Sequence, residues 1–236
     1  MGEKYTAIVL SAGSGRRMHS AVPKQYMELG GRPVIYYSLK AFEESKADSV
    51  VLVAGAEDIA YCREQIVEYF GFSKVTAVVP GGDERWLSVY QGLLACADSD
   101  YVLIHDGARP LLDVEDIHRS MECVRSHKAC VLATKVKDTI RIAGEDGCVL
   151  DTPDRDTLWA MQTPQSFSYG LLMGAYRALL AELETGGMPV VTDDAGVVER
   201  ALGQRIYLLP GSSQNIKITT PEDLMLAELL LKSARH

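Results

Sequence analysis

The stretch YTAIVLSAGSGRRMHSAVPKQY, residues 5–26, joins an apolar run to a loop that contains glycines and cations. Its first six residues are almost continuously apolar, which is typical of a strand buried on both faces of a parallel sheet. Gly13 and Gly15 follow, and glycines there let backbone amides converge on a ligand because no Cβ blocks the approach. Three cations lie beside them: Arg16, Arg17 and Lys24. The stretch therefore predicts a strand followed by an anion site, most simply a site for a run of phosphates.

Two widespread phosphate-binding motifs do not account for this loop. A P-loop requires G-x-x-x-x-G-K-[ST], and no such run occurs in the chain. A dinucleotide fingerprint requires a third glycine where this chain has Met18, and an acid about 20 residues further on. The first acid after the second predicted strand, Glu57, lies far beyond that spacing. The loop is therefore a phosphate-binding turn of a third kind.

Strand-like and helix-like segments alternate through the first two thirds of the chain. The apolar runs that predict strands are 5–10, 49–54, 74–79, 101–105 and 129–134. Segments with helical spacing lie between and after them, at 32–45, 57–70, 83–97 and 113–126. This order predicts an α/β fold with a doubly wound, mostly parallel sheet flanked by helices. We expect all 236 residues, 1–236, to form one domain of this class.

Local signals place several further elements. Pro33 is expected at the first position of the helix that follows it. Downstream we expect a helix near 169–185, a polar turn at 191–196, a strand at 205–210 and a closing helix. Thr220, Pro221 and Asp223 mark the start of that last helix, as N-cap, first residue and partner in a capping box.

The alternation breaks after Thr134. Residues 135–155 contain two short strand-like runs on either side of a Gly144–Gly147 turn, which is the pattern of a β-hairpin. The segment has little apolar side-chain mass, and an isolated hairpin is only marginally stable. We therefore expect a protruding arm at about 135–158 that packs on a partner, most simply a second copy of the chain.

Composition and charge exclude several classes of protein. The chain has 24 Lys and Arg against 32 Asp and Glu, and this acidic balance argues against a nucleic-acid surface. No apolar run reaches the length of a membrane helix. The five cysteines are scattered and form no C-x-x-C pair, so we expect reduced thiols in a cytoplasmic protein rather than disulfides or zinc ligands.

Four polar clusters lie at or just after predicted strands, at 11–25, 81–88, 105–110 and 215–224. The carboxyl ends of the strands in such a sheet form its ligand-binding edge. We therefore expect one group of side chains there: Arg17, Lys24, Asp106, Arg109 and Lys217.

The same clusters carry a family resemblance. The chain resembles the 2-C-methyl-D-erythritol 4-phosphate cytidylyltransferase family over residues 11–224, in the family's order. The matching stretches are AGSGRRM, PKQY, GGDER with Ser88, HDGARP, KDTI, TPDRDTLWAMQTPQSF, TDDA and NIKITTPEDL. The resemblance implies a Rossmann-like nucleotidyltransferase fold. It also implies that CTP and 2-C-methyl-D-erythritol 4-phosphate, a sugar-alcohol phosphate, give a cytidine diphosphate conjugate and pyrophosphate. It further implies Mg²⁺ or another divalent cation, and a homodimer formed through the hairpin arm.

The resemblance also implies roles for single residues. Catalysis would rest on Arg17, Lys24 and Lys217. Nucleotide binding would involve Ser11, Ala12, Gly13, Gly15, Arg16, Gly82, Asp83, Ser88 and Asp106. Substrate binding would involve Asp106, Arg109, Thr139, Arg155, Thr163 and Thr192, and Asp106 would also hold the metal.

The chain departs from the family pattern at a few positions. Ser11 replaces an alanine, Gly107 replaces an alanine of the common HDAARP form, and Gln214 stands where an aspartate is frequent. Asp194 stands where some members have glutamate. Two alternatives stay open at this point. One is a sister enzyme, ribitol-5-phosphate cytidylyltransferase, and the other is a nucleotide-sensing module without turnover.

Overall fold

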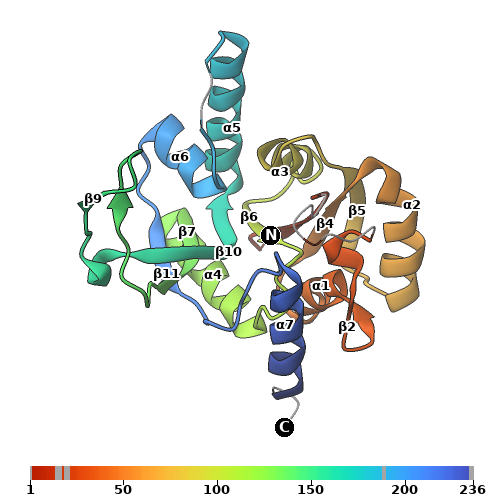
Figure 1. Ribbon diagram of the computed structural model, residues 1–236. Coiled ribbons are helices and arrows are strands. Elements are labelled where there is room, and N and C mark those ends of the chain that lie inside the picture. Colours follow the sequence, from red (N-terminus) through yellow and green to blue (C-terminus); the bar gives the residue numbers. More distant parts are fainter. Residues whose placement is uncertain (1, 14–17, 19–21, 188–189, 234–236) are drawn as a thin grey trace.

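A seven-stranded sheet runs through the molecule, as the computed structural model shows (Figure 1). The structure describes residues 2–13, 18, 22–187 and 190–233. The strand order is β11-β7-β10-β6-β1-β4-β5. The strands are β1 (Tyr5–Ser11), β4 (Ser49–Ala54), β5 (Val75–Pro80), β6 (Tyr101–Asp106), β7 (Ala129–Lys135), β10 (Trp159–Ser168) and β11 (Tyr207–Pro210). All neighbouring pairs are parallel except those made by β10, which is antiparallel to both β6 and β7. The predicted mostly parallel sheet is confirmed.

Helices cover both faces of the sheet. They are α1 (Val34–Glu44), α2 (Ile59–Tyr61), α3 (Arg85–Leu94), α4 (Val114–His127), α5 (Tyr169–Glu184), α6 (Asp194–Leu202) and α7 (Pro221–Ser233). The side chains of β1 alternate between the two layers, since Ala7 and Val9 pack with α1 and α4 whereas Ile8 packs with α3, α5 and α6. Burial on both faces is the reason that the strands read as continuous apolar runs.

Two helix starts differ from the sequence expectation in detail. Pro33 is the N-cap of α1 and pairs within β3 (Arg32–Pro33), so the prediction that it is the first helical residue was wrong by one position. The expected helix at 57–70 is not a regular α-helix: a 3₁₀ turn (Ala56–Asp58) leads through α2 into a π-helix (Cys62–Glu68). Short elements also precede α1, namely a 3₁₀ turn (Lys24–Tyr26) and β2 (Glu28–Leu29).

Two elements were missed by the sequence analysis. Residues 159–168 form β10, an inner strand that pairs with β6 and β7. The stretch expected to be a polar turn begins α6, because Asp193 is an N-cap whose side chain accepts a hydrogen bond from the Gly196 amide. Thr192 therefore lies just before a helix that packs on α5 and β7.

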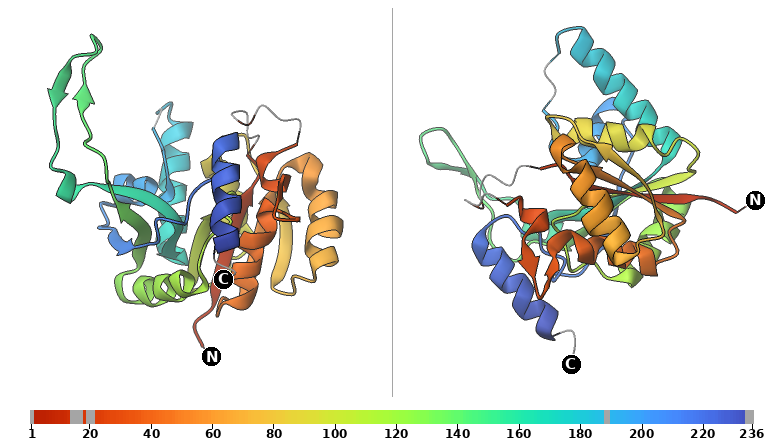
Figure 2. Two further views of the ribbon diagram at one scale, coloured as in Figure 1. Left: turned by 60° about the horizontal axis from the view of Figure 1, so that its bottom comes forward. Right: turned by 90° about the vertical axis from the view of Figure 1, so that its right-hand side faces the viewer.

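The segment after β7 leaves the body of the molecule before it returns as β10 (Figure 2). Within it, β8 (Ile142–Ala143) and β9 (Val149–Asp151) pair in the antiparallel sense. The Gly147 amide donates to the Gly144 carbonyl at 3.0 Å, which closes the turn between them. A 3₁₀ turn (Arg155–Thr157) then leads back to the sheet. Side chains of β8 and β9 are exposed, so the segment buries little against its own chain.

The closing helix begins where the capping pattern predicts. The Asp223 carboxylate accepts hydrogen bonds from the Thr219 and Thr220 amides, each at 2.9 Å. This bond to the Thr220 amide is the half of a capping box that satisfies a backbone donor at the helix start. Among the residues described, no helix is long and apolar enough to cross a membrane.

Candidate active site

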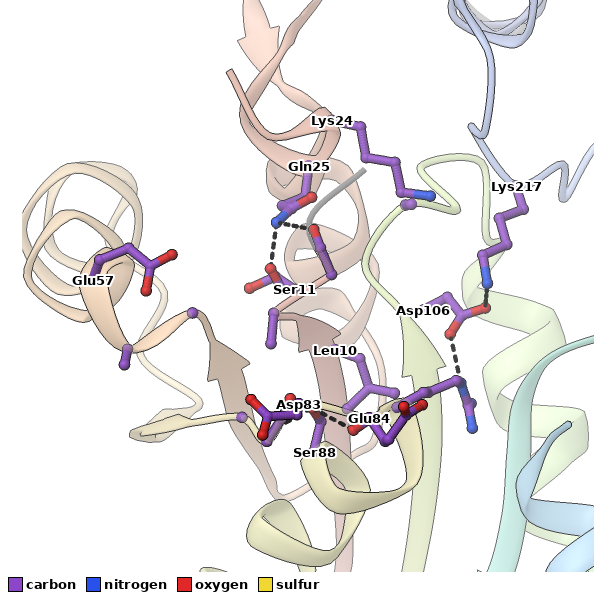
Figure 3. A pocket seen from close by; sticks show the side chains of 18 residues that line it. Leu10, Ser11, Lys24, Gln25, Glu57, Asp83, Glu84, Ser88, Asp106 and Lys217 are labelled. Carbon is purple, nitrogen blue, oxygen red and sulfur yellow. Dashed lines mark hydrogen bonds and ion pairs between the residues drawn. The ribbon is translucent and has the colours of Figure 1, made fainter. Parts of the chain in front are cut away.

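A cavity of about 530 Å³ opens at the carboxyl ends of β1, β4, β5 and β6 (Figure 3). Its volume lies within the usual range for small-molecule sites. It is lined by Leu10, Ser11, Ala12, Gly13, Lys24, Gln25, Gly55, Ala56, Glu57, Gly81, Gly82, Asp83, Glu84, Arg85, Ser88, Asp106, Ala108 and Lys217. Seven of the residues predicted for nucleotide binding are therefore together: Ser11, Ala12, Gly13, Gly82, Asp83, Ser88 and Asp106. Gly15, Arg16 and Arg17 lie outside the residues that the structure describes.

Gln25 fixes the first part of the glycine loop. Its side-chain amide is buried and donates to the carbonyls of Ser11 and Gly13, the latter at 3.2 Å. The Ser11 hydroxyl donates to the Val53 carbonyl of the neighbouring strand at 3.1 Å. The exit of β1 is thus fixed, and serine is accommodated where alanine is usual. Sequence reasoning assigned no role to Gln25, although it lies in the PKQY stretch.

The opposite wall of the cavity needs glycine at two positions. A Cβ at Gly81 would lie 2.5 Å from the Ala12 Cβ, and a Cβ at Gly82 would lie 2.4 Å from the Leu87 Cβ. The Ser88 hydroxyl is buried and accepts from the Gly82 amide at 3.2 Å. The loop after β1 and the loop after β5 therefore approach one another closely, and Ser88 fixes the turn between β5 and α3.

Two lysines from opposite ends of the chain reach the same cavity. The Lys24 ammonium donates to the Ile218 carbonyl at 2.8 Å, and the Lys217 ammonium pairs with Asp106 Oδ2 at 2.8 Å. Figure 3 shows both lysines on one side of the cavity and Glu57 on the opposite side. The cavity is therefore polarised, with its cations gathered next to the end of β6.

Asp106, the last residue of β6, is surrounded by cations. Besides Lys217, Arg85 Nε lies 3.4 Å from Oδ1 and Arg109 Nε lies 3.8 Å from Oδ2. Burial by itself would raise the pKa of Asp106, but Arg85, Lys217 and Arg109 outweigh it and hold that pKa well below its usual value. The carboxylate is therefore anionic throughout the physiological range.

A hydrogen-bonded chain supports Asp106 from behind. The Asp106 amide donates to Thr163 Oγ1 at 3.1 Å, and that hydroxyl lies 3.0 Å from His105 Nδ1. His105 Nε2 lies 3.2 Å from the Arg109 carbonyl, which can only accept, so Nε2 carries the proton and Nδ1 accepts from Thr163. Burial lowers the pKa of His105 to about 4, so its ring is neutral. Thr163 is thus buried behind Asp106.

Arg85 and Asp194 form a second ion pair at the cavity that sequence reasoning missed. Arg85 Nη2 lies 2.9 Å from Asp194 Oδ2, and Asp194 Oδ1 accepts from the Tyr176 hydroxyl at 2.6 Å. Burial would lower the pKa of Arg85, but the charges of Asp194 and Asp106 outweigh it and raise that pKa. The only sequence signal for this pair was its place in the GGDER and TDDA stretches.

Other predicted substrate-binding residues lie outside the cavity. Arg109 is next to it, and its Nη1 donates to the Asn215 carbonyl at 2.7 Å. Thr139 and Arg155 are exposed on the projecting segment, where Arg155 Nη1 donates to the Lys137 carbonyl at 3.4 Å. Thr192 is exposed just before α6. None of these residues is among those that line the cavity within the described part of one chain.

Known proteins match this chain along almost its whole length. The model of the IspD family, described as 2-C-methyl-D-erythritol 4-phosphate cytidylyltransferase, matches residues 5–233. Proteins named 2-C-methyl-D-erythritol 4-phosphate cytidylyltransferase include one from Lachnoclostridium phytofermentans, 50% identical over 230 residues, with 98% of this chain and 97% of that protein covered. Another, from Lachnospira eligens, is 50% identical over 228 residues and covers 96% of this chain and 99% of its own.

A solved structure shows the same fold. The crystal structure of 4-diphosphocytidyl-2C-methyl-D-erythritol synthase from Anaerococcus prevotii has a TM-score of 0.85 and 34% identity, and the match covers 98% of this chain and 96% of that one. The cavity is lined by parts of the stretches through which the sequence resembles such proteins: the start of the glycine loop, the GGDER residues and the aspartate of HDGARP. The chain belongs to the IspD family, the 2-C-methyl-D-erythritol 4-phosphate cytidylyltransferases.

Proposed function

We propose that this chain transfers the cytidylyl group of CTP to 2-C-methyl-D-erythritol 4-phosphate in the non-mevalonate route to isoprenoid precursors. The products are 4-diphosphocytidyl-2-C-methyl-D-erythritol and pyrophosphate. The observation that carries the proposal is the convergence of Lys24, Lys217 and Asp106 at one side of a nucleotide-sized cavity, in a chain whose relatives bear this name over nearly their full length.

The proposed chemistry needs charge stabilisation rather than a general base. The attacking phosphate monoester is already anionic, so no proton has to be removed from it. Two polyanions must meet, and negative charge grows on the α-phosphate oxygens and on the leaving pyrophosphate. Lys24 and Lys217 are placed to balance that charge, and the amides of the Ser11–Gly13 turn add donors. In our proposal Lys24 binds the triphosphate, with Arg17, and Lys217 faces the α-phosphate.

The Asp106 carboxylate offers the oxygen ligands that a divalent cation of the Mg²⁺ type takes, and we propose that it binds one together with the nucleotide, whose phosphates then take up the Lys217 charge. Mg²⁺ takes oxygen ligands and is commonly held by one or two carboxylates together with substrate phosphates and water. The described residues contain no group of three or more His, Cys, Asp or Glu side chains that could hold a metal, so in our proposal the nucleotide phosphates supply further ligands. When bound, the cation would neutralise phosphate charge.

Selection of cytosine over uracil is a problem of hydrogen-bond direction. The 4-amino group of cytosine donates, whereas the 4-oxo group of uracil accepts, so carbonyls that face this edge would reject UTP. The Gly81–Gly82 turn lies against Ala12 and Ser88 and is free of side chains. We propose that this wall binds the base, which directs the triphosphate toward the two lysines.

The methylerythritol phosphate requires further cations and hydroxyls, which we assign to Arg109, Thr139, Arg155 and Thr192. Thr139 and Arg155 lie on the projecting segment, whose apolar side chains are exposed. These are Ile140, Ile142, Val149 and Leu150. A second copy of the chain would cover them and bring its own Thr139 and Arg155 to the neighbouring cavity. We therefore propose a homodimer with shared sites.

We place the enzyme in the cytoplasm. Its five cysteines are free, and four of them are buried. Free thiols are typical of proteins in reducing compartments, whereas secreted domains pair them. This support is independent of the site itself.

A pyrophosphate-release assay tests the proposed function. CTP is supplied with Mg²⁺ and with either 2-C-methyl-D-erythritol 4-phosphate or ribitol 5-phosphate. We expect release with the first and little with the second. Preference for ribitol 5-phosphate would assign the chain to the sister activity.

A further inference from the structure

Arg85 connects two carboxylates that belong to different parts of the fold. It is the first residue of α3 and lines the cavity. Its Nε faces Asp106 Oδ1 at 3.4 Å, and its Nη2 faces Asp194 Oδ2 at 2.9 Å. Asp106 ends β6, and Asp194 begins α6, so one guanidinium joins α3, β6 and α6.

Asp194 is a buried charge that depends on this contact. Its side chain is 0% exposed, and among the described residues Arg85 is the only cation within ion-pair distance of it. The Tyr176 hydroxyl satisfies the other carboxylate oxygen at 2.6 Å. The Asp194 and Ala195 amides are fixed in turn by Gln165 Oε1, at 3.1 and 3.0 Å. An unpaired carboxylate at this depth would be costly, so the Asp194 side chain, at the start of α6, is tied to the position of Arg85.

The two oxygens of Asp106 are held by different cations. Arg85 holds Oδ1, whereas Lys217 holds Oδ2 at 2.8 Å. Lys217 can therefore exchange Asp106 for a phosphate while Arg85 keeps the carboxylate in place. The planar guanidinium is suited to this because its N–H groups point to two acceptors at fixed angles, which a lysine ammonium on a single flexible stem cannot reproduce.

We infer that Arg85 is a positioning residue, which holds Asp106 and the start of α6 in one register and so sets the distance between the nucleotide and the sugar-phosphate ends of the site. The inference rests on the proposed function, because it is the segment before α6 that carries Thr192. Arg85 acts here through Asp106 and Asp194 and not as a ligand of the reacting phosphates.

The test compares Arg85→Lys and Asp194→Asn with Arg119→Lys. Arg119 is a matched control: it also bridges a buried carboxylate, Asp116 at 2.7 Å, and a backbone carbonyl, but lies away from the cavity. Arg85→Lys keeps the charge that Asp194 needs, so it should fold. We expect its kcat to fall by about 100-fold, the loss typical of a misplacement of about 1 Å. Its KM for methylerythritol phosphate should rise about tenfold, and its KM for CTP should change less than about threefold.

Asp194→Asn separates positioning from direct contact. If Arg85 acts through Asp194, this variant shows the same defect, and the double variant is no worse than either single one. A normal Asp194→Asn beside a defective Arg85→Lys would mean that Arg85 does not act through Asp194 and the start of α6, which overturns the inference. Parental kinetics in Arg85→Lys would overturn it as well.

Amide hydrogen exchange gives a readout that needs no turnover. Arg85→Lys should speed exchange at Ala195 and Gly196 relative to the parent, and Arg119→Lys should not. If the parent releases no pyrophosphate, the proposed function fails, while this exchange result still decides whether Arg85 holds the start of α6. Unchanged exchange at both amides would refute the linkage.

Discussion

The ammonium groups of Lys24 and Lys217 reach one side of the cavity although the two residues lie 193 positions apart in the sequence (217 − 24). Both belong to stretches after strands, which is why sequence reasoning could place them together. It could not name Gln25, Arg85 or Thr163 as supports, because those roles depend on which carbonyl or carboxylate the folded chain brings within reach. The cations were predictable from local pattern, and their supports were not.

Removing either lysine should slow the reaction more than it weakens binding. Lys24→Ala and Lys217→Ala should lower kcat about 100-fold or more, which corresponds to about 3 kcal/mol of barrier, with a smaller rise in the KM for CTP. Lys24→Arg should not restore the rate, since the planar guanidinium cannot place its charge where the compact lysine ammonium lies. Steady-state kinetics with the exposed Lys40→Ala as control provide the check. Near-parental kcat in either variant would withdraw that lysine's role.

Gly107 illustrates how one departure from the family pattern is accommodated. A Cβ at Gly107 would lie 2.4 Å from Ile35 Cδ1 and 2.9 Å from the Leu10 carbonyl oxygen. In this chain Ile35 therefore occupies the space that an alanine methyl would need. The glycine was visible in the sequence, but its partner on α1 was not.

Gly107→Ala should destabilise the chain by about 1–3 kcal/mol through overpacking. Ile35→Val removes the clashing Cδ1, and alone it should cost about 0.5–1.5 kcal/mol. The loss measured for the double variant should be smaller than the sum of the two single losses, because the shorter side chain relieves the contact with Ile35 while the contact with the Leu10 carbonyl remains. Urea unfolding of all four proteins gives the coupling energy. Simple additivity of the two changes would contradict this packing account.

At the scale of elements, β10 was missed because its sequence does not look like a strand. The stretch LWAMQTPQSF is polar in part, yet its Gln162, Thr163, Gln165 and Ser166 are buried. Three of those side chains have partners in other elements: Gln162 Nε2 donates to the Ser212 carbonyl at 2.8 Å, Thr163 Oγ1 lies 3.0 Å from His105 Nδ1, and Gln165 Nε2 donates to Asp193 Oδ2 at 2.9 Å. Hydrophobic pattern predicts strands that bury apolar side chains, and it fails for a strand whose polar groups support the site. The parallel strands were predicted because they bury apolar residues on both faces.

The contact between β6 and β10 makes stability depend on pH through His105. Burial lowers the pKa of His105 to about 4 in the folded chain, whereas an unfolded histidine titrates near pH 6.5. As the pH falls below 6.5, the unfolded chain gains a proton that the folded chain does not, so stability is lost between about pH 6.5 and 4. We expect the parent to be less stable at pH 5 than at pH 8 by about 2 kcal/mol from this residue.

Urea unfolding of His105→Gln at the two pH values checks this assignment. The variant should lose most of that pH dependence, whatever its absolute stability, whereas the exposed His127→Gln should keep it. The lowered pKa of Asp106 acts in a separate window, because its contribution is lost only as the pH falls below the usual aspartate range. An unchanged difference between pH 8 and pH 5 in His105→Gln would mean that the buried ring is not the source.

For the whole molecule, the sharing of sites between two chains is the proposal with the largest consequence. Arg155→Ala and Lys24→Ala should each be inactive alone. If Arg155 serves the partner's cavity, equal mixing with subunit exchange puts about half of the dimers in the hetero form, each with one intact site. Activity should return to about a quarter of the parental value per site. No recovery, with exchange shown by a tag pull-down, would place Arg155 in the site of its own chain.

Phosphorus NMR of a single reaction tests the proposed function most directly. CTP, Mg²⁺ and 2-C-methyl-D-erythritol 4-phosphate are incubated with the chain, and the sugar monoester signal is followed. We expect this signal to be replaced by the two coupled signals of a new diphosphate, in equal amount with pyrophosphate, and we expect Lys217→Ala to suppress both. Release of pyrophosphate with CMP and an unchanged monoester signal would show hydrolysis in place of transfer, and would contradict the assignment of the cavity to cytidylyl transfer.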